Sequence, residues 1–370
     1  MPGPATSEAP GERPVPLFAT TLEPFQEAMA ERLAEVARSG RYILGPEVTA
    51  FEEEFARFLG VGHCIGVANG TDALTIAVRA LGVEPGDEVV LPSFTFYATA
   101  EAVVNAGAVP VFCDIDPDTF CVTSDTVKQV VTPRTKAVVP VHLFGNLAPV
   151  EELLELGLPV LEDAAQAAGA RQGERRAGAL GHAATFSFFP SKNLPCLGDG
   201  GAVVTDDEQV AAYARRLRFH GSTDKLTHTE VGYNSRLDSL QAAVLRLLLP
   251  ELDGWNERRR GIAAAYDRAA LGDHLTTPRA AAGAEHVFHL YVARHADPDG
   301  LAARLGERGV QARGYYRRPT HLQPAMARWG GPQLRLPGTE EAARTNIALP
   351  MGPELSDRAV ESVVAACASG

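Results

Sequence analysis

With 370 residues and a formal net charge of −12 at pH 7, the chain can bury a large core, and its acidic balance disfavours general binding of nucleic acid or anionic membranes. The five cysteines are odd in number and form no Cys-x-x-Cys pair, which is typical of a reducing compartment. No apolar run reaches the roughly 18 residues that a membrane-spanning helix needs. The amino terminus also lacks a signal pattern, so a cytoplasmic protein is predicted.

The first part of the chain predicts a leader followed by two helices. Residues 1–14 are rich in Pro, Gly, Ala and Glu, a composition that predicts disorder. Apolar side chains then recur every three to four residues over 22–38 and again over Pro46–Phe58. This spacing predicts two amphipathic helices.

Between about Cys64 and Val204, short β-branched runs alternate with helical stretches. Near-continuous apolar strands in such an alternation predict a largely parallel sheet that is covered by helices on both faces. Ligands of such sheets bind beyond the carboxyl ends of the strands, so polar residues at those ends are candidates for a site. The predicted strands are Ile65–Val67, Val89–Leu91, Val109–Phe112, Ala137–Val141, Pro159–Leu161, Ala184–Phe188 and Ala202–Val204.

The first candidate is the segment Asn69-Gly70-Thr71-Asp72, which follows a predicted strand and opens a predicted helix. Asn69 or Thr71 can simply cap that helix. Alternatively, the glycine lets a ligand approach the backbone, and the free N–H groups and the helix dipole favour an anion such as phosphate. Both interpretations stay open from these residues alone.

Two further candidates follow later strands. Phe96 comes just after Val89–Leu91, where an aromatic side chain either joins the core or stacks on a flat heteroaromatic ring. Asp163 closes an apolar strand, and Gln166 is expected one helical turn beyond it on the same side. Asp163 either caps a helix or pairs with a buried cation such as a protonated pyridine nitrogen, with Gln166 bonding a neighbouring ring substituent.

Lys192 is the only lysine between Lys136 and Lys225, and its neighbours are apolar or small. A single lysine is usually a solvated surface residue. A partly desolvated lysine, however, loses some of its preference for the ammonium form, and its amine can then form a Schiff base with a carbonyl. With an acid partner, a flat stacking face and an anion pocket nearby, Lys192 favours pyridoxal phosphate as the cofactor.

In combination and in this order, the motifs make the chain similar to the DegT/DnrJ/EryC1/StrS family of sugar aminotransferases over roughly Val15 to Val364. The resemblance implies an α/β fold of the fold-type I, aspartate-aminotransferase kind. Its large mixed, mostly parallel sheet domain would span 15–255, and a smaller α+β domain at 256–370 would close over the substrate. The segments that carry the resemblance are Ser39–Pro46, Ala68–Leu74, Pro85–Val89, Pro92–Phe96, Val141–Gly145, Glu162–Gln166, Phe186–Asn193, Gly232–Asp238 and His321–Pro324.

The resemblance also implies roles for single residues. Lys192 would form the Schiff base with pyridoxal 5′-phosphate and shuttle the proton, with pyridoxamine phosphate as the form reached during turnover. Asp163 would pair with the pyridinium nitrogen, Gln166 would contact the ring hydroxyl, and Phe96 would stack on the ring. Gly70, Thr71 and Ser187 would hold the phosphate, and Asp72 would be a further cofactor-binding residue.

Asn234 would reach the phosphate of the partner subunit's cofactor, which implies a homodimer with two shared sites. For the substrate, the resemblance points to Arg313, Tyr316 and His321, and no metal ligand is assigned. The implied activity is ping-pong transfer of an amino group from L-glutamate to a nucleotide-linked keto-6-deoxyhexose, with dTDP favoured. The amine would enter at C3 or C4, in the biosynthesis of a deoxyaminosugar for a natural product or a surface glycan.

Several residues depart from the family pattern. Pro195 and Cys196 stand where small residues are commoner, and Arg317 and Arg318 stand in a loop that often carries prolines. The two arginines could meet a nucleotide diphosphate or be plain surface charge. The Asn234–Asp238 and Leu252–Asn256 segments resemble 3-aminotransferases of dTDP sugars slightly more than other members of the family.

Three functions other than a sugar aminotransferase stay open from the sequence. Sugar dehydratases of the family carry histidine in place of the lysine, so Lys192 favours transamination. An aminotransferase of a keto-inositol would differ only in its substrate. A cofactor-binding regulatory protein would be expected to have a fused DNA-binding segment, for which residues 1–14 are too short.

Overall fold

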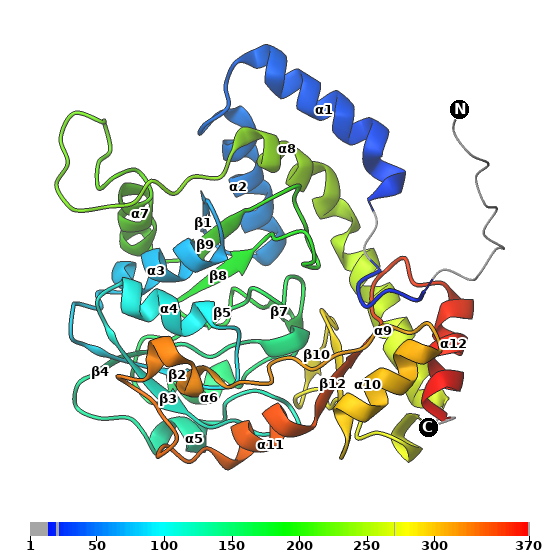
Figure 1. Cartoon of the computed structure of the whole chain (residues 1–370). Coiled ribbons are helices and arrows are strands. Elements are labelled where there is room, and N and C mark those ends of the chain that lie inside the picture. Colours follow the sequence, from blue (N-terminus) through cyan, green and yellow to red (C-terminus); the bar gives the residue numbers. More distant parts are fainter. Residues whose placement is uncertain (1–13, 20–21, 270, 369–370) are drawn as a thin grey trace, which may run out of the picture.

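The computed structural model describes residues 14–19, 22–269 and 271–368 (Figure 1). Of the predicted leader at 1–14, the structure describes only residue 14, and the rest of this prediction lies outside the described residues. Within the described part of the chain, no helix is both long and apolar enough to cross a membrane. The five cysteines are buried and unpaired.

Seven strands form the central sheet of the molecule. Their order is β3-β2-β4 and then β5-β8-β9-β1, and two parallel bridges, Val138 to Val160 and Val141 to Asp163, join the two groups. All neighbours are parallel except the two pairs that contain β9, which confirms the mixed, mostly parallel sheet. The strands are β1 (His63–Val67), β2 (Glu88–Pro92), β3 (Val109–Cys113), β4 (Thr135–Val138), β5 (Leu161–Asp163), β8 (Ala183–Ser187) and β9 (Gly201–Thr205).

Strand β9 runs antiparallel because it follows β8 directly, without a crossover helix. Neighbouring strands joined by a loop that stays at one end of the sheet run in opposite directions, whereas parallel neighbours need a crossover that returns to the other end. The loop between them, residues 188–200, contains Lys192. This connection therefore places the lysine at the carboxyl end of β8.

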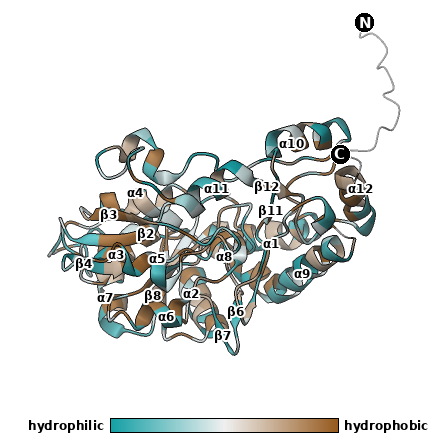
Figure 2. Ribbon diagram, turned by 90° about the horizontal axis from the view of Figure 1, so that it is seen from below, coloured by the Kyte–Doolittle hydropathy of each residue, from teal (hydrophilic) through white to brown (hydrophobic). Residues whose placement is uncertain are grey.

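Helices cover both faces of the sheet, as the alternation of strands and helices predicts. Side chains along one strand alternate between two apolar clusters: Val90 packs on one face, and Val89 and Leu91 pack on the other. The first face is covered by α2 (Pro46–Leu59) and α8 (Ser239–Leu248), and α1 (Gln26–Ser39) lies outside them. The opposite face is covered by α3 (Gly70–Ala80), α4 (Ala98–Asn105) and α7 (Glu208–Leu217). Figure 2 shows the apolar strands enclosed between these helices.

The carboxyl-terminal part has an apolar cluster of its own, centred on Tyr266, Tyr291 and Ile347. Residues 15–19 lie against it, since Val15 and Phe18 form bridges with Val310 and Met351. The expected domain boundary at 255/256 falls inside the continuous helix α9 and stays a prediction. The elements of this part are α9 (Leu252–Arg268), β10 (Ala284–Glu285), β11 (Tyr291–Arg294), α10 (Pro298–Glu307), α11 (Pro337–Thr345), β12 (Asn346–Leu349) and α12 (Asp357–Ala368).

Short elements complete the chain. The two-residue strands β6 (Arg171–Gln172) and β7 (Arg175–Arg176) pair antiparallel with each other, and β6 also pairs antiparallel with β10. Two one-turn helices, α5 (Ser124–Lys128) and α6 (Val150–Leu154), lie in contact with each other. Single 3₁₀ turns occur at Glu23–Phe25, Leu143–Gly145, Leu249–Glu251, Leu271–Asp273, Thr320–Leu322 and Pro324–Met326.

Candidate functional site

Lys192 lies in the loop that joins β8 to β9, just after a turn that begins at Phe189. The loop is closed by backbone bonds: the N–H of Phe188 donates to Gly200 O at 2.8 Å, and the N–H of Cys196 donates to Phe188 O at 2.7 Å. Next to the lysine, Asn193 Nδ2 donates to Asn256 Oδ1 (2.8 Å) and to Val287 O (3.0 Å), which fixes the loop against α9. The position of Lys192 is therefore set by contacts that do not involve its own side chain.

The amine of Lys192 is partly buried and has no recorded hydrogen bond or ion pair within the described residues. Removal of water from the ammonium group lowers the pKa of Lys192 to about 8, although the Asp163 carboxylate acts in the opposite direction. At pH 7 roughly a tenth of this amine is therefore unprotonated, far more than for a solvated lysine with a pKa of about 10.4. That is the state in which an amine attacks a carbonyl.

Asp163 is buried at the carboxyl end of β5, beside β8. Thr99, in the first turn of α4, donates its hydroxyl to Asp163 Oδ2 at 2.8 Å, and the N–H of Ala165 donates to Oδ1 at 3.2 Å. Burial raises the pKa of the Asp163 carboxyl above its usual value despite these two bonds. The carboxylate is thus held in place but lacks a cation in hydrogen-bond contact among the described residues, and a ligand with an N–H⁺ group would supply one.

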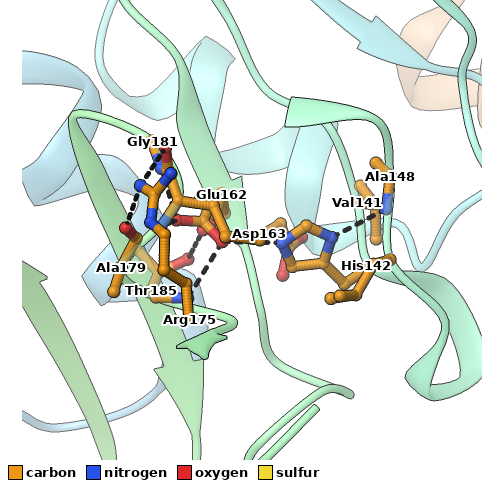
Figure 3. A network of polar contacts seen from close by, with 12 residues as sticks. Val141, His142, Ala148, Glu162, Asp163, Arg175, Ala179, Gly181 and Thr185 are labelled. Atoms are coloured by element: carbon orange, nitrogen blue, oxygen red, sulfur yellow. Dashed lines mark hydrogen bonds and ion pairs between the residues drawn. The ribbon is translucent and has the colours of Figure 1, made fainter. Parts of the chain in front are cut away.

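The residue before Asp163 is the centre of a second buried network (Figure 3). Glu162 Oε2 accepts from His142 Nε2 (2.8 Å) and from the N–H of Gly178 (2.9 Å). Its Oε1 accepts from the N–H groups of Leu180 (2.8 Å) and Gly181 (2.7 Å). Because His142 Nδ1 accepts from the N–H of Ala148 at 3.0 Å, the ring proton lies on Nε2. Glu162 thus holds the strand end that carries Asp163, a role that sequence reasoning did not assign to it.

Replacing Glu162 with glutamine is expected to destabilise the fold. Four donors converge on the two carboxylate oxygens, so the amide NH₂ of glutamine must face two of them. A change of the His142 tautomer does not help, because a proton on Nδ1 would then face the N–H of Ala148. Each buried donor left without an acceptor costs about 1–3 kcal/mol, so the free energy of unfolding should fall by at least about 2 kcal/mol in urea titrations.

Glu151→Gln is the matched control. Glu151 is exposed and makes only a 3.6 Å ion pair with Arg175, so its replacement should change the free energy of unfolding by less than about 0.5 kcal/mol. Equal stability of the two variants would contradict the structural role of Glu162.

Aromatic side chains line the space beside Asp163. Phe96 is 55% exposed, and its ring centroid lies 5.9 Å from that of Tyr316. Gln166 Nε2 donates to the Tyr316 hydroxyl at 3.1 Å, and Gln166 Oε1 accepts from the N–H of Phe144 at 2.7 Å. Residues 164–170 form successive turns and not the expected helix. Gln166 still lies near Asp163, and one of its amide hydrogens is left for a ligand.

The segment Asn69–Asp72 opens α3 as expected. Asn69 is the cap, since its Oδ1 accepts from the N–H of Asp72 at 2.8 Å. The N–H groups of Gly70 and Thr71 therefore point out of the helix without intrahelical acceptors. Gly70 is packed against β8, where an added Cβ would lie 2.8 Å from Ser187 Cβ. The helix end and Ser187 together form a corner beside the loop of Lys192, and its free N–H groups have the polarity that suits an anion.

The remaining predicted residues lie apart from this group or are engaged elsewhere. Asn234 is exposed on the long loop between α7 and α8, which projects from the body of the molecule (Figure 1). Arg313 is exposed, and its guanidinium donates to the Tyr315 hydroxyl at 2.7 Å. His321 is buried, with its Nδ1 2.5 Å from Ser93 Oγ. The substrate roles of Arg313, Tyr316 and His321 stay predictions.

Arg317 and Arg318, the two arginines that depart from the family pattern, both contact other residues of the chain. Arg317 pairs with Asp299 at 2.7 Å, and Arg318 donates to Leu322 O at 2.8 Å, so each has a protein partner that accounts for it. Within the described ranges, no group of three or more His, Cys, Asp or Glu side chains is arranged to hold a metal ion.

The chain is similar in sequence to known proteins over most of its length. The profile of the DegT/DnrJ/EryC1/StrS aminotransferase family matches residues 24–368. A pleiotropic regulatory protein of Geobacillus stearothermophilus is 47% identical, over 90% of this chain and 91% of the relative. A dTDP-3-amino-3,4,6-trideoxy-alpha-D-glucose transaminase of Streptomyces venezuelae is 45% identical, over 90% of this chain and 89% of the relative.

The fold is also that of a solved structure. The crystal structure of S. venezuelae DesV, in complex with a ketimine intermediate, is similar to the present structure with a TM-score of 0.93. The two sequences are 43% identical, and the match covers 96% of this chain and 97% of DesV.

Proposed function

Because this chain belongs to the DegT/DnrJ/EryC1/StrS aminotransferase family, we propose that it is a transaminase that uses pyridoxal 5′-phosphate and acts on a nucleotide-linked keto-6-deoxyhexose. L-Glutamate is the proposed amino donor. One observation carries the proposal: within the described part of the chain, the Lys192 amine has no hydrogen-bond or ion-pair partner and the buried Asp163 carboxylate contacts no cation, and the two lie at the carboxyl ends of adjacent strands.

The residues present fit this cofactor. The buried Asp163 carboxylate would be stabilised by the N–H⁺ group of the pyridine ring. The half-exposed ring of Phe96 provides an aromatic face for stacking on the cofactor. Gly70 and Ser187 form the corner where the first N–H groups of α3 can bind a phosphate. When bound, pyridoxal phosphate supplies the carbonyl carbon that accepts the amine and the ring that takes up electrons from the substrate.

Lys192 is proposed to move the proton. Its Nζ would take the α-proton of the amino donor and pass it to the cofactor in the first half-reaction, and would take a proton from the cofactor and deliver it to the sugar carbon in the second. A general base works best when its pKa lies near the pH of the reaction, and the pKa of about 8 satisfies this requirement. Asp163 keeps the pyridine nitrogen protonated, Gln166 orients the ring hydroxyl, and Phe96 fixes the plane of the ring.

Similarity to the S. venezuelae transaminase, whose name specifies a 3-amino sugar linked to dTDP, supports C3 as the position of transfer and dTDP as the nucleotide. We further propose a homodimer with shared sites, in which Asn234 reaches the partner's phosphate corner. The exposure of Asn234 and, on the same loop, of the apolar Val231 (87%) and Leu226 (86%) supports this arrangement, because apolar side chains exposed together on one segment are typical of protein–protein contacts.

The experiment is an absorbance titration of the protein reconstituted with pyridoxal phosphate. A Schiff-base band should form, and excess L-glutamate should convert it to the shorter-wavelength band of pyridoxamine phosphate. A dTDP-linked 3-keto-6-deoxyhexose should then restore the first band. If no Schiff-base band forms, the proposal fails at Lys192, whereas a band that ignores every amino donor indicates a dehydratase. Restoration by a keto-inositol alone indicates the cyclitol enzyme.

A regulatory role is the second candidate, and the name of the Geobacillus stearothermophilus relative favours it. The two functions differ in turnover: a regulator would bind the cofactor without transferring the amine to any keto sugar. Multiple turnovers measured as 2-oxoglutarate release in the presence of a keto-sugar nucleotide would establish the enzyme.

The reaction of the apoprotein with pyridoxal phosphate should depend on pH with a midpoint near 8. Only the neutral amine attacks the aldehyde, and its fraction rises as the pH passes the pKa of Lys192, which burial lowers to about 8. Stopped-flow measurement of the Schiff-base band from pH 6 to pH 10 gives the profile. A midpoint near the value of about 10.4 for a solvated lysine would contradict the desolvation of this amine.

A further inference from the structure

Two buried threonines form a hydrogen-bonded chain with the carboxylate of Asp163. Thr99 lies in the first turn of α4 and is 1% exposed, and Thr95 lies in the connection between β2 and α4 and is 3% exposed. Thr99 Oγ1 is 2.8 Å from Asp163 Oδ2, and Thr95 Oγ1 is 3.0 Å from Thr99 Oγ1. The acid of the candidate site is thus the end of a chain of two hydroxyl groups.

This chain has only one direction while Asp163 is ionised. A carboxylate has no proton to donate, so Thr99 donates its single hydroxyl hydrogen to Asp163. Thr99 Oγ1 can then only accept from Thr95, which must donate. Both O–H dipoles therefore point their hydrogens toward the carboxylate, and aligned hydrogen bonds of this kind strengthen one another.

The surroundings of Asp163 give these hydroxyl groups a specific effect. Burial raises the pKa of the Asp163 carboxyl, and the bond from Thr99 is the largest influence in the opposite direction. The positive charge of Lys192 and the ring of His142 also lower this pKa, but neither makes a recorded hydrogen bond to the carboxylate. Tyr316, the other titratable group nearby, stays neutral because its own pKa is raised by burial and by the charge of Asp163.

We propose that Thr95 and Thr99 are positioning residues that keep Asp163 ionised and thereby keep the pyridine nitrogen of the cofactor protonated. The inference rests on the proposed transaminase function and explains how its acid partner keeps a charge in a buried place. Between a buried carboxylate and a pyridine nitrogen, a proton can lie on either partner. Hydrogen bonds to the charged form of an acid favour that form, so loss of the two donors favours the neutral pair.

The same turn of the chain also carries Phe96, the proposed stacking residue, between the two threonines. This turn is fixed from outside, because the N–H of Thr320 donates to Ser93 O at 2.9 Å and Thr320 Oγ1 donates to Thr95 O at 3.4 Å. Residues 95–99 would therefore set both the plane of the cofactor ring and the proton on its nitrogen.

The first test measures the pKa of Asp163 in the apoprotein, by NMR of ¹³C-labelled aspartate carboxyl groups with Asp163→Asn to identify the signal. Thr99→Val keeps the shape of the side chain but has no hydroxyl, so the pKa of Asp163 should rise by about one to two units. Thr99→Ser restores the donor and should return the pKa to within about half a unit of the wild-type value. An unchanged pKa in Thr99→Val would overturn the proposal.

The order of the chain gives a second test. Thr95→Val removes the donor to Thr99 but leaves the bond to Asp163, so it should raise the pKa by less than about half as much as Thr99→Val. In a background that already carries Thr99→Val, the same substitution should add little, because Thr99 no longer links the two groups. Equal and additive shifts would contradict the chain.

Thr345→Val is the matched control for these variants. Thr345 is a buried threonine of α11 that donates to a backbone carbonyl, Glu341 O, at 2.8 Å and not to a carboxylate. Its replacement should leave the pKa of Asp163 unchanged. A shift as large as that of Thr99→Val would show that loss of any buried hydroxyl disturbs the site, and the specific role of the chain would fall.

A third measurement uses the protein reconstituted with pyridoxal phosphate that carries ¹⁵N in its ring. The wild-type nitrogen resonance should be that of a protonated pyridine. In Thr99→Val it should move toward that of a neutral pyridine, and Thr99→Ser should restore it. A nitrogen that stays as protonated in Thr99→Val as in the wild type would overturn the link between the threonines and the cofactor.

The outcomes separate this inference from the function on which it rests. The pKa of the apoprotein does not involve the cofactor, so an unchanged value overturns the role of the threonines and leaves the transaminase standing. If the wild type forms no Schiff base with pyridoxal phosphate, the proposed function itself fails. Should Thr99→Val not fold, Thr95→Val still tests the chain, and the absence of any rise in the pKa of Asp163 would overturn it.

Discussion

Replacement of Lys192 by alanine is expected to abolish transamination. The variant loses both the amine that joins the cofactor and the base that moves the proton, and proton transfer by a positioned side chain alone contributes about 10²–10⁴-fold. Turnover of glutamate with a keto-sugar nucleotide should therefore fall by at least about 10⁴-fold. Stopped-flow and steady-state release of 2-oxoglutarate measure the loss.

Pyridoxamine phosphate should still bind to this variant, because its ring and phosphate contacts are made by Asp163, Phe96 and the start of α3. Lys136→Ala is the control, since Lys136 is exposed on β4 and away from the site. A Lys192→Ala protein that retained near-normal turnover would rule out the assignment. A variant that bound no pyridoxamine phosphate would show that Lys192 also holds the loop, contrary to the backbone contacts of Phe188 and Asn193.

Asp163→Asn is expected to lower turnover by about 10²–10³-fold, the usual effect of removing one preorganised electrostatic partner. Asparagine keeps the shape of the side chain and can still accept from Thr99 or Ala165, but it carries no charge to hold a proton on the pyridine nitrogen. The rate of conversion of the Schiff-base band by glutamate measures the effect.

The stability of the apoprotein gives an independent check on Asp163. Burial raises the pKa of this carboxyl, which means that the folded chain disfavours its ionised form. Neutral asparagine should therefore leave the melting temperature of the apoprotein unchanged or raise it, while activity falls. The exposed Asp125→Asn should alter neither quantity. A large drop in melting temperature for Asp163→Asn would make this carboxylate structural.

The sequence predicted the strands of the central sheet, and physical causes explain where the predicted and observed strand ends differ. The strand predicted at Pro159–Leu161 is β5 at Leu161–Asp163, because the acidic Glu162 and Asp163 are satisfied by backbone N–H groups and by Thr99. The strand predicted at Ala137–Val141 ends at Val138 as β4, since Pro140 has no N–H for a ladder. The satisfied acidic side chains thus let β5 extend past its predicted end, whereas the proline ends β4 before its predicted end.

A residue of the candidate site could be predicted from the sequence when it lies at the end of a predicted strand or just after it. Lys192, Asp163, Phe96 and Gly70 belong to this class, and the structure places them at the ends of β8, β5, β2 and β1 or in the loops that follow. Thr99 could not be found in this way, because its contact with Asp163 depends on the lateral order of the strands.

The loop of Lys192 also bears on how enzymes of this kind diverge. Backbone bonds at Phe188 and Cys196 and the amide of Asn193 shape the loop, so its conformation does not depend on which side chain occupies position 192. Selection can therefore exchange the reactive group at this point without rebuilding the scaffold. Such independence means that one amino-acid substitution at position 192 suffices to change the reactive group, as the resemblance implies for dehydratases that carry histidine there.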